Sequence, residues 1–193
     1  NPLYTVGRQL VETIQAHLPV SQEEAKQRAI RLLQDTGIPA AAERIDHYPH
    51  QFSGGMRQRI VIAIALINNP IVLIADEPTT ALDVTVQAQI LDLMMELQQE
   101  FNMAIILITH DLGVVAEVAQ DVIVMYGGRV VERSTVEALF VEPVHPYAEG
   151  LLNAVTSLEG TARGALQTIP GTPPSMIAIP SGCSFHPRCA FNT

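Results

Sequence analysis

The chain has 193 residues and a mass of 21.0 kDa, and 48% of its residues are hydrophobic while only 16% are charged, a composition that excludes a wholly disordered chain. Twenty acidic and eleven basic residues give a formal net charge of −9, which argues against a duplex-binding surface, because such a surface needs clustered lysines and arginines. The only lysine is Lys26, so chemistry that requires a lysine at another position is excluded.

The first 50 residues are predicted to be mainly helical. Apolar residues recur at helical spacing over residues 6–14, which predicts an amphipathic helix. Ser21 with Glu24 fits a capping box at the start of a second helix, and Gly37 is expected to end that helix. Residues 39–50, which follow, are predicted to form a loop.

Helices and strands are then predicted to alternate. Residues 53–67 are expected to form a helix, and the breaker residues 68–70 prevent the longest apolar stretch from spanning a membrane. Residues 71–75 and 103–109 are apolar runs without alternation, which predicts strands buried on both faces. A long helix is expected over residues 84–101, between the two strands.

The rest of the chain is predicted to hold a short helix, a hairpin and an irregular tail. The helix is expected at residues 112–118, and strands at 121–126 and 129–133 are joined by Gly127-Gly128, a hairpin signal. The alternation of strands and helices predicts an α/β fold with a parallel sheet and right-handed crossovers. Residues 161–193 carry five prolines and no acidic residue, so this tail is predicted to be irregular.

The chain start and the cysteines bear on the compartment. No charged region precedes an apolar stretch at the start, so we predict no secretory signal. Cys183 and Cys189 are too few for a disulfide framework, which favours a reducing, cytosolic compartment. They are either thiolate ligands to a soft metal or cluster, or two ordinary reduced cysteines, and their spacing is not C-x-x-C.

Polar residues follow both predicted parallel strands. Asp76 and Glu77 come after the first strand, at the sheet edge where open α/β folds place ligands. One carboxylate could reach the hydration shell of Mg²⁺ while the other orients a water; the alternative is a pair of solvated acids in a turn. His110 follows the second strand, where it either donates to a phosphate oxygen or is satisfied by backbone.

Ser53-Gly54-Gly55 lies at a predicted helix start. Bare amides, a hydroxyl and the positive end of the helix dipole suit a phosphate group. A serine cap followed by flexible glycines is the commoner explanation of such a tripeptide when it occurs alone, so this motif is a weak signal by itself.

Four motifs occur in a specific order. They read FSGGMRQR at 52–59, IVLIADEP at 71–78, TALD at 80–83 and ITHD at 108–111. In that order they resemble the signature motif, the second nucleotide-binding motif, the D-loop and the switch-histidine motif of the ATP-binding-cassette (ABC) ATPases. The resemblance covers roughly residues 1–140.

A narrower resemblance rests on YPHQ at 48–51, DVTVQAQ at 83–89, HPY at 145–147 and IPGTPP at 169–174. These segments are similar to the importer branch for oligopeptides, dipeptides and nickel, closest to its oligopeptide D subunits. Some members hold a 4Fe-4S cluster with four cysteines in the C-terminal extension. Cys183 and Cys189 match the first two positions only.

The chain departs from the family pattern at two residues and in two missing motifs. Phe52 stands where many members have Leu, and Met56 where many have Gln. No G-x-x-x-x-G-K-[ST] loop occurs, and the Q-loop glutamine is also missing. The chain therefore resembles the later half of a P-loop NTPase subunit, without its phosphate-binding loop.

The resemblance implies roles for individual residues in the intact subunit. Asp76 would support Mg²⁺ through its water shell, Glu77 would polarise the attacking water, and His110 would contact the γ-phosphate. The residues implied to contact ATP held by a partner subunit are Ser53, Gly54, Gly55, Met56 and Asp83.

The resemblance also implies an organisation and a function. Residues 1–70 would be a helical subdomain with the signature motif, 71–140 the later part of a RecA-like core, and 141–193 the C-terminal extension. The intact protein would be the ATP-hydrolysing subunit of a bacterial peptide importer, peripheral at the cytoplasmic face of the cell membrane, whereas this chain alone is expected to be inactive. Its partners would be a second ATPase subunit, two transmembrane permeases and, indirectly, a peptide-binding protein, with no nucleic acid.

Two alternatives stay open. The first is an ABC-type ATPase of DNA repair or chromosome organisation, although such proteins usually carry long heptad arms or zinc modules, which this chain lacks. The second is a non-catalytic interaction fragment, because the phosphate-binding loop does not occur in the chain.

Overall fold

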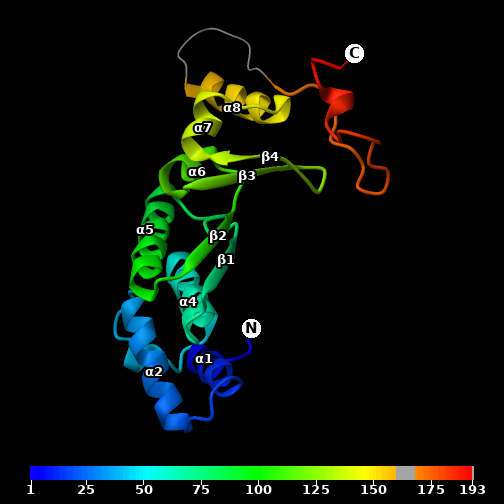
Figure 1. Cartoon of the computed structure of the whole chain (residues 1–193). Coiled ribbons are helices and arrows are strands. Elements are labelled where there is room, and N and C mark those ends of the chain that lie inside the picture. The colour runs from blue at the N-terminus through cyan, green and yellow to red at the C-terminus, as the bar shows by residue number, and fades with distance from the viewer. Residues whose placement is uncertain (160–167, 193) are drawn as a thin grey trace. The chain divides into compact units, whose positions relative to one another are not determined.

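The computed structural model describes residues 1–159 and 168–192, and side chains within them except those of 155–159 (Figure 1). The chain forms two compact units, Asn1–Ile108 and Thr109–Thr193. The predicted division into functional parts at residues 70 and 140 concerns roles rather than compactness, and it stays a prediction.

The first unit carries a helical part followed by a strand–helix–strand part. Its elements in chain order are α1 (Val6–Gln15), α2 (Gln22–Asp35), α3 (Ala41–Arg44), a 3-10 turn (Pro49–Gln51), α4 (Gly54–Leu66), β1 (Val72–Asp76), α5 (Val84–Phe101) and β2 (Ala104–Ile108).

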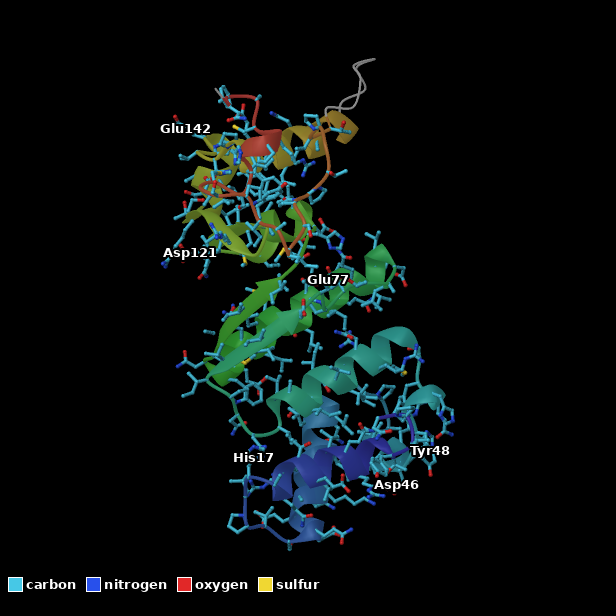
Figure 2. All side chains as sticks on the ribbon, turned by 90° about the vertical axis from the view of Figure 1, so that its right-hand side faces the viewer. His17, Asp46, Tyr48, Glu77, Asp121 and Glu142 are labelled. Atoms are coloured by element: carbon cyan, nitrogen blue, oxygen red, sulfur yellow. The ribbon has the colours of Figure 1, made fainter. Side chains whose placement is uncertain are left out.

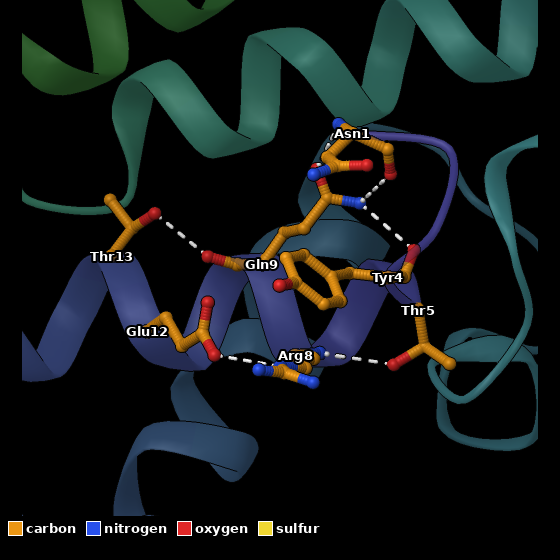
Figure 3. A network of polar contacts seen from close by, with 7 residues as sticks. All are labelled: Asn1, Tyr4, Thr5, Arg8, Gln9, Glu12 and Thr13. Atoms are coloured by element: carbon orange, nitrogen blue, oxygen red, sulfur yellow. Dashed lines mark hydrogen bonds and ion pairs between the residues drawn. The ribbon is translucent and has the colours of Figure 1, made fainter.

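The predicted helices of the first 50 residues are present. Thr5 caps α1 by accepting from Arg8 N, and Arg8 pairs with Glu12 at 2.7 Å on the same exposed face (Figure 3). Ser21 caps α2 by accepting from Glu24 N at 3.1 Å. The Glu24 carboxylate accepts instead from Arg28 at 2.6 Å, so the bond to the cap backbone expected of a capping box gives way to an ion pair along the helix.

The predicted loop over residues 39–50 contains the short helix α3 and the 3-10 turn, so that prediction was wrong in part. The reason is tertiary packing, because Ala41 and Ile45 are buried in the core of the first unit. Gly7 lets α1 approach this segment closely. A Cβ at Gly7 would lie 2.6 Å from Ile45 Cγ1, and the Gly7 amide donates to Ile45 O at 2.7 Å.

One hydrophobic core joins the helices and the sheet of the first unit. Its buried members come from all four long helices and from β1, and they include Leu10, Leu33, Leu66, Leu73 and Ile90. Side chains of β2 are partly buried against it. Burial of this shared apolar surface, rather than helix propensity, supplies most of the stability of such elements.

The parallel pairing of the two strands is confirmed. β1 pairs with β2 in parallel, with Leu73 opposite Ile105 and Asp76 opposite Ile108. The prediction that both faces are buried was wrong for the described chain: Leu73 and Ala75 point into the core, whereas Ile74 on the other face is 64% exposed. The helices of this unit pack on one face of the strands only, so alternate apolar side chains are left in solvent.

The second unit contains α6 (Leu112–Val118), β3 (Asp121–Tyr126), β4 (Arg129–Thr135), α7 (Val136–Val141), α8 (Pro146–Glu159) and a 3-10 turn (His186–Arg188). The predicted hairpin is confirmed, and Gly127 and Gly128 both have positive φ, as a tight two-residue connection requires. The predicted alternation of strands and helices does not continue the parallel sheet beyond β2, because β3 pairs antiparallel with β4 in a two-stranded sheet. The two-residue turn places β4 directly beside β3, so the antiparallel pairing is local in sequence.

The described part of the tail is irregular, as predicted, apart from the 3-10 turn. Arg188 fixes it by donating to Pro170 O at 2.8 Å, to Ile169 O at 3.0 Å and to the Tyr126 hydroxyl at 3.1 Å. The Phe185 ring packs edge-on against the Tyr126 ring. Among the described residues, no helix combines the length and apolar character needed to cross a membrane.

Candidate nucleotide site

The carboxylate pair lies where the sequence predicts it. Asp76 is the last residue of β1, and both it and Glu77, which follows directly, are exposed. Glu77 lies at the carboxyl end of the strand (Figure 2). The Glu77 amide donates to Ile108 O at 2.9 Å, which ties the residue to the end of β2. Glu77 has a φ of 46°, a left-handed conformation that is uncommon for a residue with a side chain and that occurs often at functional sites.

The Glu77 carboxylate has a hydrogen-bond donor three residues ahead. The Thr80 hydroxyl donates to Glu77 Oε2 at 2.8 Å, and the turn between the two residues is closed by Thr80 N donating to Glu77 O at 3.2 Å. Thr80 is not among the site residues predicted from the sequence. A hydroxyl three positions after a carboxylate, beyond a proline, was the only signal in the sequence.

Ser53 and the two glycines begin α4. Ser53 is the N-cap, and its hydroxyl accepts from Met56 N at 3.3 Å, so the commoner explanation of this motif is realised. Ser53 and Gly54 are exposed, which leaves the helix start open to a ligand. Met56 is half-buried beside the core, with its sulfur 4.0 Å from Arg44 Nη1.

The structure brings the start of α4 next to the start of α5. A Cβ at Gly55 would lie 2.8 Å from Val86 Cγ1, and one at Gly54 would lie 3.8 Å from Leu82 Cδ2. Asp83 is the N-cap of α5 and accepts from Val86 N at 2.9 Å. The residues predicted to contact a partner's nucleotide therefore lie at two adjoining helix N-termini. The Asp83 carboxylate is already engaged in capping α5.

His110 belongs to the second unit and is exposed there. Hydrogen bonds hold the backbone that follows His110. Asp111 N donates to Thr109 Oγ1 at 3.0 Å, and the Asp111 carboxylate caps α6 by accepting from Gly113 N and Val114 N. Within the second unit, these hydrogen bonds shape the turn from Thr109 into α6, and His110 lies in that turn.

The two cysteines lie on the tail as free thiols. Cys183 is exposed, with Sγ 3.6 Å from His145 Nε2, whereas Cys189 is half-buried after the 3-10 turn. In the parts of the chain that the structure describes, no three residues among His, Cys, Asp and Glu are grouped to hold a metal. An iron–sulfur site is therefore not supported by these residues.

Two family models match the chain. One, described as "ABC transporter", matches residues 2–80, and the other, "Oligopeptide/dipeptide transporter, C-terminal region", matches residues 131–193. The chain belongs to the ABC transporter ATPases. The motif resemblance is thus confirmed, and the C-terminal match supports the peptide branch of this family rather than its DNA-repair members.

Curated ABC relatives extend the match over nearly the whole chain. The oligopeptide transport ATP-binding proteins OppD of Haemophilus influenzae and Salmonella typhimurium are 52% and 54% identical, over 100% and 98% of this chain. A putative peptide import ATP-binding protein of Brucella melitensis is 55% identical over 99% of it. The chain spans 56–59% of the length of these relatives.

Solved ABC structures share the fold. The protein cbiO1 of Clostridium perfringens, part of an ABC transporter complex, has a TM-score of 0.62 at 32% identity, over 72% of this chain and 54% of its own. The dimeric ABC transporter cassette MJ0796 has a TM-score of 0.59 at 32% identity, over 70% of this chain and 58% of its own. These matches confirm a partial ABC ATPase fold with mixed α/β structure.

The donor set of the chain suits Mg²⁺ and a nucleotide phosphate. Mg²⁺ takes oxygen ligands and keeps several waters, and Asp76 and Glu77 offer exposed carboxylate oxygens at one strand end. The open amide groups at the start of α4 are phosphate donors by position. The sequence holds no phosphate-binding loop, so these residues are candidates for only one part of a nucleotide site.

Proposed function

We propose that the full-length protein is the ATP-binding subunit of a bacterial ABC importer for oligopeptides or dipeptides, and that this chain carries its signature, carboxylate and C-terminal parts. The observation that carries the catalytic half of this proposal is Glu77, an exposed carboxylate held in a left-handed conformation at the end of β1. The peptide half is supported by the C-terminal match and by the relatives' names.

In this proposal each residue has a separate role in ATP hydrolysis. Glu77 accepts a proton from the attacking water and orients it, while His110 donates to the developing negative charge on the phosphate. Asp76 would hold Mg²⁺ through its hydration shell, and the metal would supply charge neutralisation. The amides of Gly54 and Gly55, with Ser53, meet the phosphate of a nucleotide bound by a second ATPase subunit.

The proposed partners follow from the same assignment. A second ATPase subunit completes each nucleotide site, and two transmembrane permeases place the protein at the cytoplasmic face of the membrane. A peptide-binding protein acts on the far side of the permeases. A four-cysteine iron–sulfur cluster stays a prediction for the full-length protein, to which this chain contributes two thiols.

Transport by the complete assembly tests this function. The full-length subunit, assembled with its permeases and binding protein in vesicles, is supplied with Mg²⁺-ATP on the cytoplasmic side and offered a labelled pentapeptide, a labelled dipeptide or Ni²⁺. We expect ATP-dependent uptake of at least one peptide. Uptake of Ni²⁺ alone, or no coupled uptake of any of the three, would contradict the peptide assignment.

A further inference from the structure

We propose that Thr80 is a positioning residue for the Glu77 carboxylate. The inference rests on the proposed function, because it assigns a role to Thr80 only through the catalytic use of Glu77. It is carried by one contact, the hydrogen bond of 2.8 Å from the Thr80 hydroxyl to Glu77 Oε2.

The backbone already fixes where the Glu77 side chain starts. Its amide is bound to Ile108 O at 2.9 Å, and its carbonyl accepts from Thr80 N at 3.2 Å. The left-handed φ of 46° sets the direction in which Cβ leaves the chain. These constraints hold the Cα–Cβ bond, whereas the three side-chain torsions of a glutamate are set by the contacts of the side chain itself. A carboxylate that must receive a proton from one particular water needs a further constraint.

Thr80 supplies that constraint from a stiff support. A threonine is branched at Cβ, so its hydroxyl occupies few rotamers. Pro78, which is buried, fixes the turn between the two residues. A hydroxyl that donates to Oε2 selects one rotamer of the carboxylate.

The turn does not depend on this hydroxyl. The bond from Thr80 N to Glu77 O closes it through the backbone, and Thr80 is exposed. Valine keeps the branched shape of threonine and removes only the donor. Thr80→Val therefore separates the positioning of Glu77 from the shape of the turn, and Thr80→Ser restores the donor.

The test uses the full-length protein in its assembled transporter, with steady-state ATP hydrolysis as the readout. The variants are Thr80→Val, Thr80→Ser, Glu77→Gln and the double variant Glu77→Gln/Thr80→Val. Thr85→Val, at an exposed position on α5, is the matched control for loss of a threonine hydroxyl.

We expect Thr80→Val to lower kcat by about tenfold, as loss of one hydrogen bond to a charged group does, while KM for ATP stays within about twofold. Thr80→Ser should recover most of that loss, and Thr85→Val should match the parent. In the Glu77→Gln background, Thr80→Val should lower the residual rate by less than about twofold, because no catalytic carboxylate is left to position.

Three outcomes contradict this inference. A Thr80→Val enzyme with the parental kcat shows that the hydroxyl is not needed. A tenfold loss that persists in the Glu77→Gln background shows that Thr80 acts independently of Glu77. Parental turnover by Glu77→Gln overturns the catalytic assignment itself and the inference with it, whereas an inactive Glu77→Gln beside an unimpaired Thr80→Val overturns the inference alone.

Discussion

Gly55 at the start of α4 has no room for a side chain, because a Cβ there would lie 2.8 Å from Cγ1 of Val86 on α5. Val86 is branched at Cβ and cannot easily rotate away. The glycine of the signature motif therefore has a packing role inside this chain as well as the proposed contact with a nucleotide held by a second subunit.

This double role makes a specific prediction for Gly55→Asp in the full-length protein. ATP hydrolysis by the assembled transporter should fall more than nucleotide binding by the isolated subunit, since the new carboxylate faces a phosphate held by the partner. Combining Gly55→Ala or Gly55→Asp with Val86→Ala separates the packing effect at Gly55 from the effect of the added charge. Gly55→Ala/Val86→Ala should regain hydrolysis, and Gly55→Asp/Val86→Ala should not; full recovery by the aspartate double variant would leave packing as the only role.

A second prediction concerns the chain of 193 residues itself. It should not hydrolyse ATP appreciably, because its sequence holds no phosphate-binding loop with a lysine and so lacks the main ground-state contacts to the β- and γ-phosphates. Phosphate release from the purified chain with Mg²⁺-ATP is the measurement. Turnover that disappears on Glu77→Gln would show that the chain is active and that this prediction is wrong.

Gly7 gives a prediction on stability. In the full-length protein, Gly7→Ala should lower the free energy of unfolding by about 1–3 kcal/mol, the usual cost of overpacking, because the new methyl group would meet Ile45 Cγ1 and the Ile45 carbonyl. Gly54→Ala is the control, since its Cβ would be in ordinary contact 3.8 Å from Leu82. Denaturant unfolding checks both variants. Equal free energies of unfolding for Gly7→Ala and Gly54→Ala would contradict this prediction, because α1 would then shift to make room for the methyl group without loss of stability.

Tyr147 gives a prediction on pH. Burial, and next the nearby Tyr126, raise the pKa of Tyr147 above its usual range, while Arg188 opposes them. A raised folded-state pKa means that the associated stability is present below about pH 10, the unfolded value, and is lost as pH rises through the folded value. A pH titration followed by tyrosinate absorbance should therefore show a late component, at a pH above the usual tyrosine range, that Tyr147→Phe removes. A Tyr147→Phe variant that keeps the late component would assign it to another tyrosine.

The sequence predicted well the features that are encoded locally. The helix predicted at 84–101 has these bounds in the structure, where Asp83 caps its start and Asn102, with a positive φ, follows its end. The position of Asp76 and Glu77 followed from a short apolar strand that ends in two acids. These signals lie within a few residues of the feature that they specify.

The features that depend on distant residues could not be predicted in the same way. The apolar run of β1 was interpreted as burial on both faces, but burial of Ile74 depends on what packs over it, and no local pattern specifies that. The contact of Gly55 with Val86 joins residues on two helices, and the hydrogen bond from Thr80 to Glu77 depends on a left-handed φ. Both contacts depend on the tertiary structure.

The most direct test of the account is Glu77→Gln in the full-length subunit within its assembled transporter, with Glu96→Gln at an exposed position on α5 as the matched control. Glutamine keeps the size and hydrogen bonding of the side chain but cannot accept the proton. The account predicts parental ATP affinity and a loss of hydrolysis of about 10²–10⁴-fold, the usual contribution of a general base, with Glu96→Gln unchanged. Hydrolysis by Glu77→Gln within threefold of the parental rate would contradict the account, because the carboxylate at the end of β1 would then have no catalytic part.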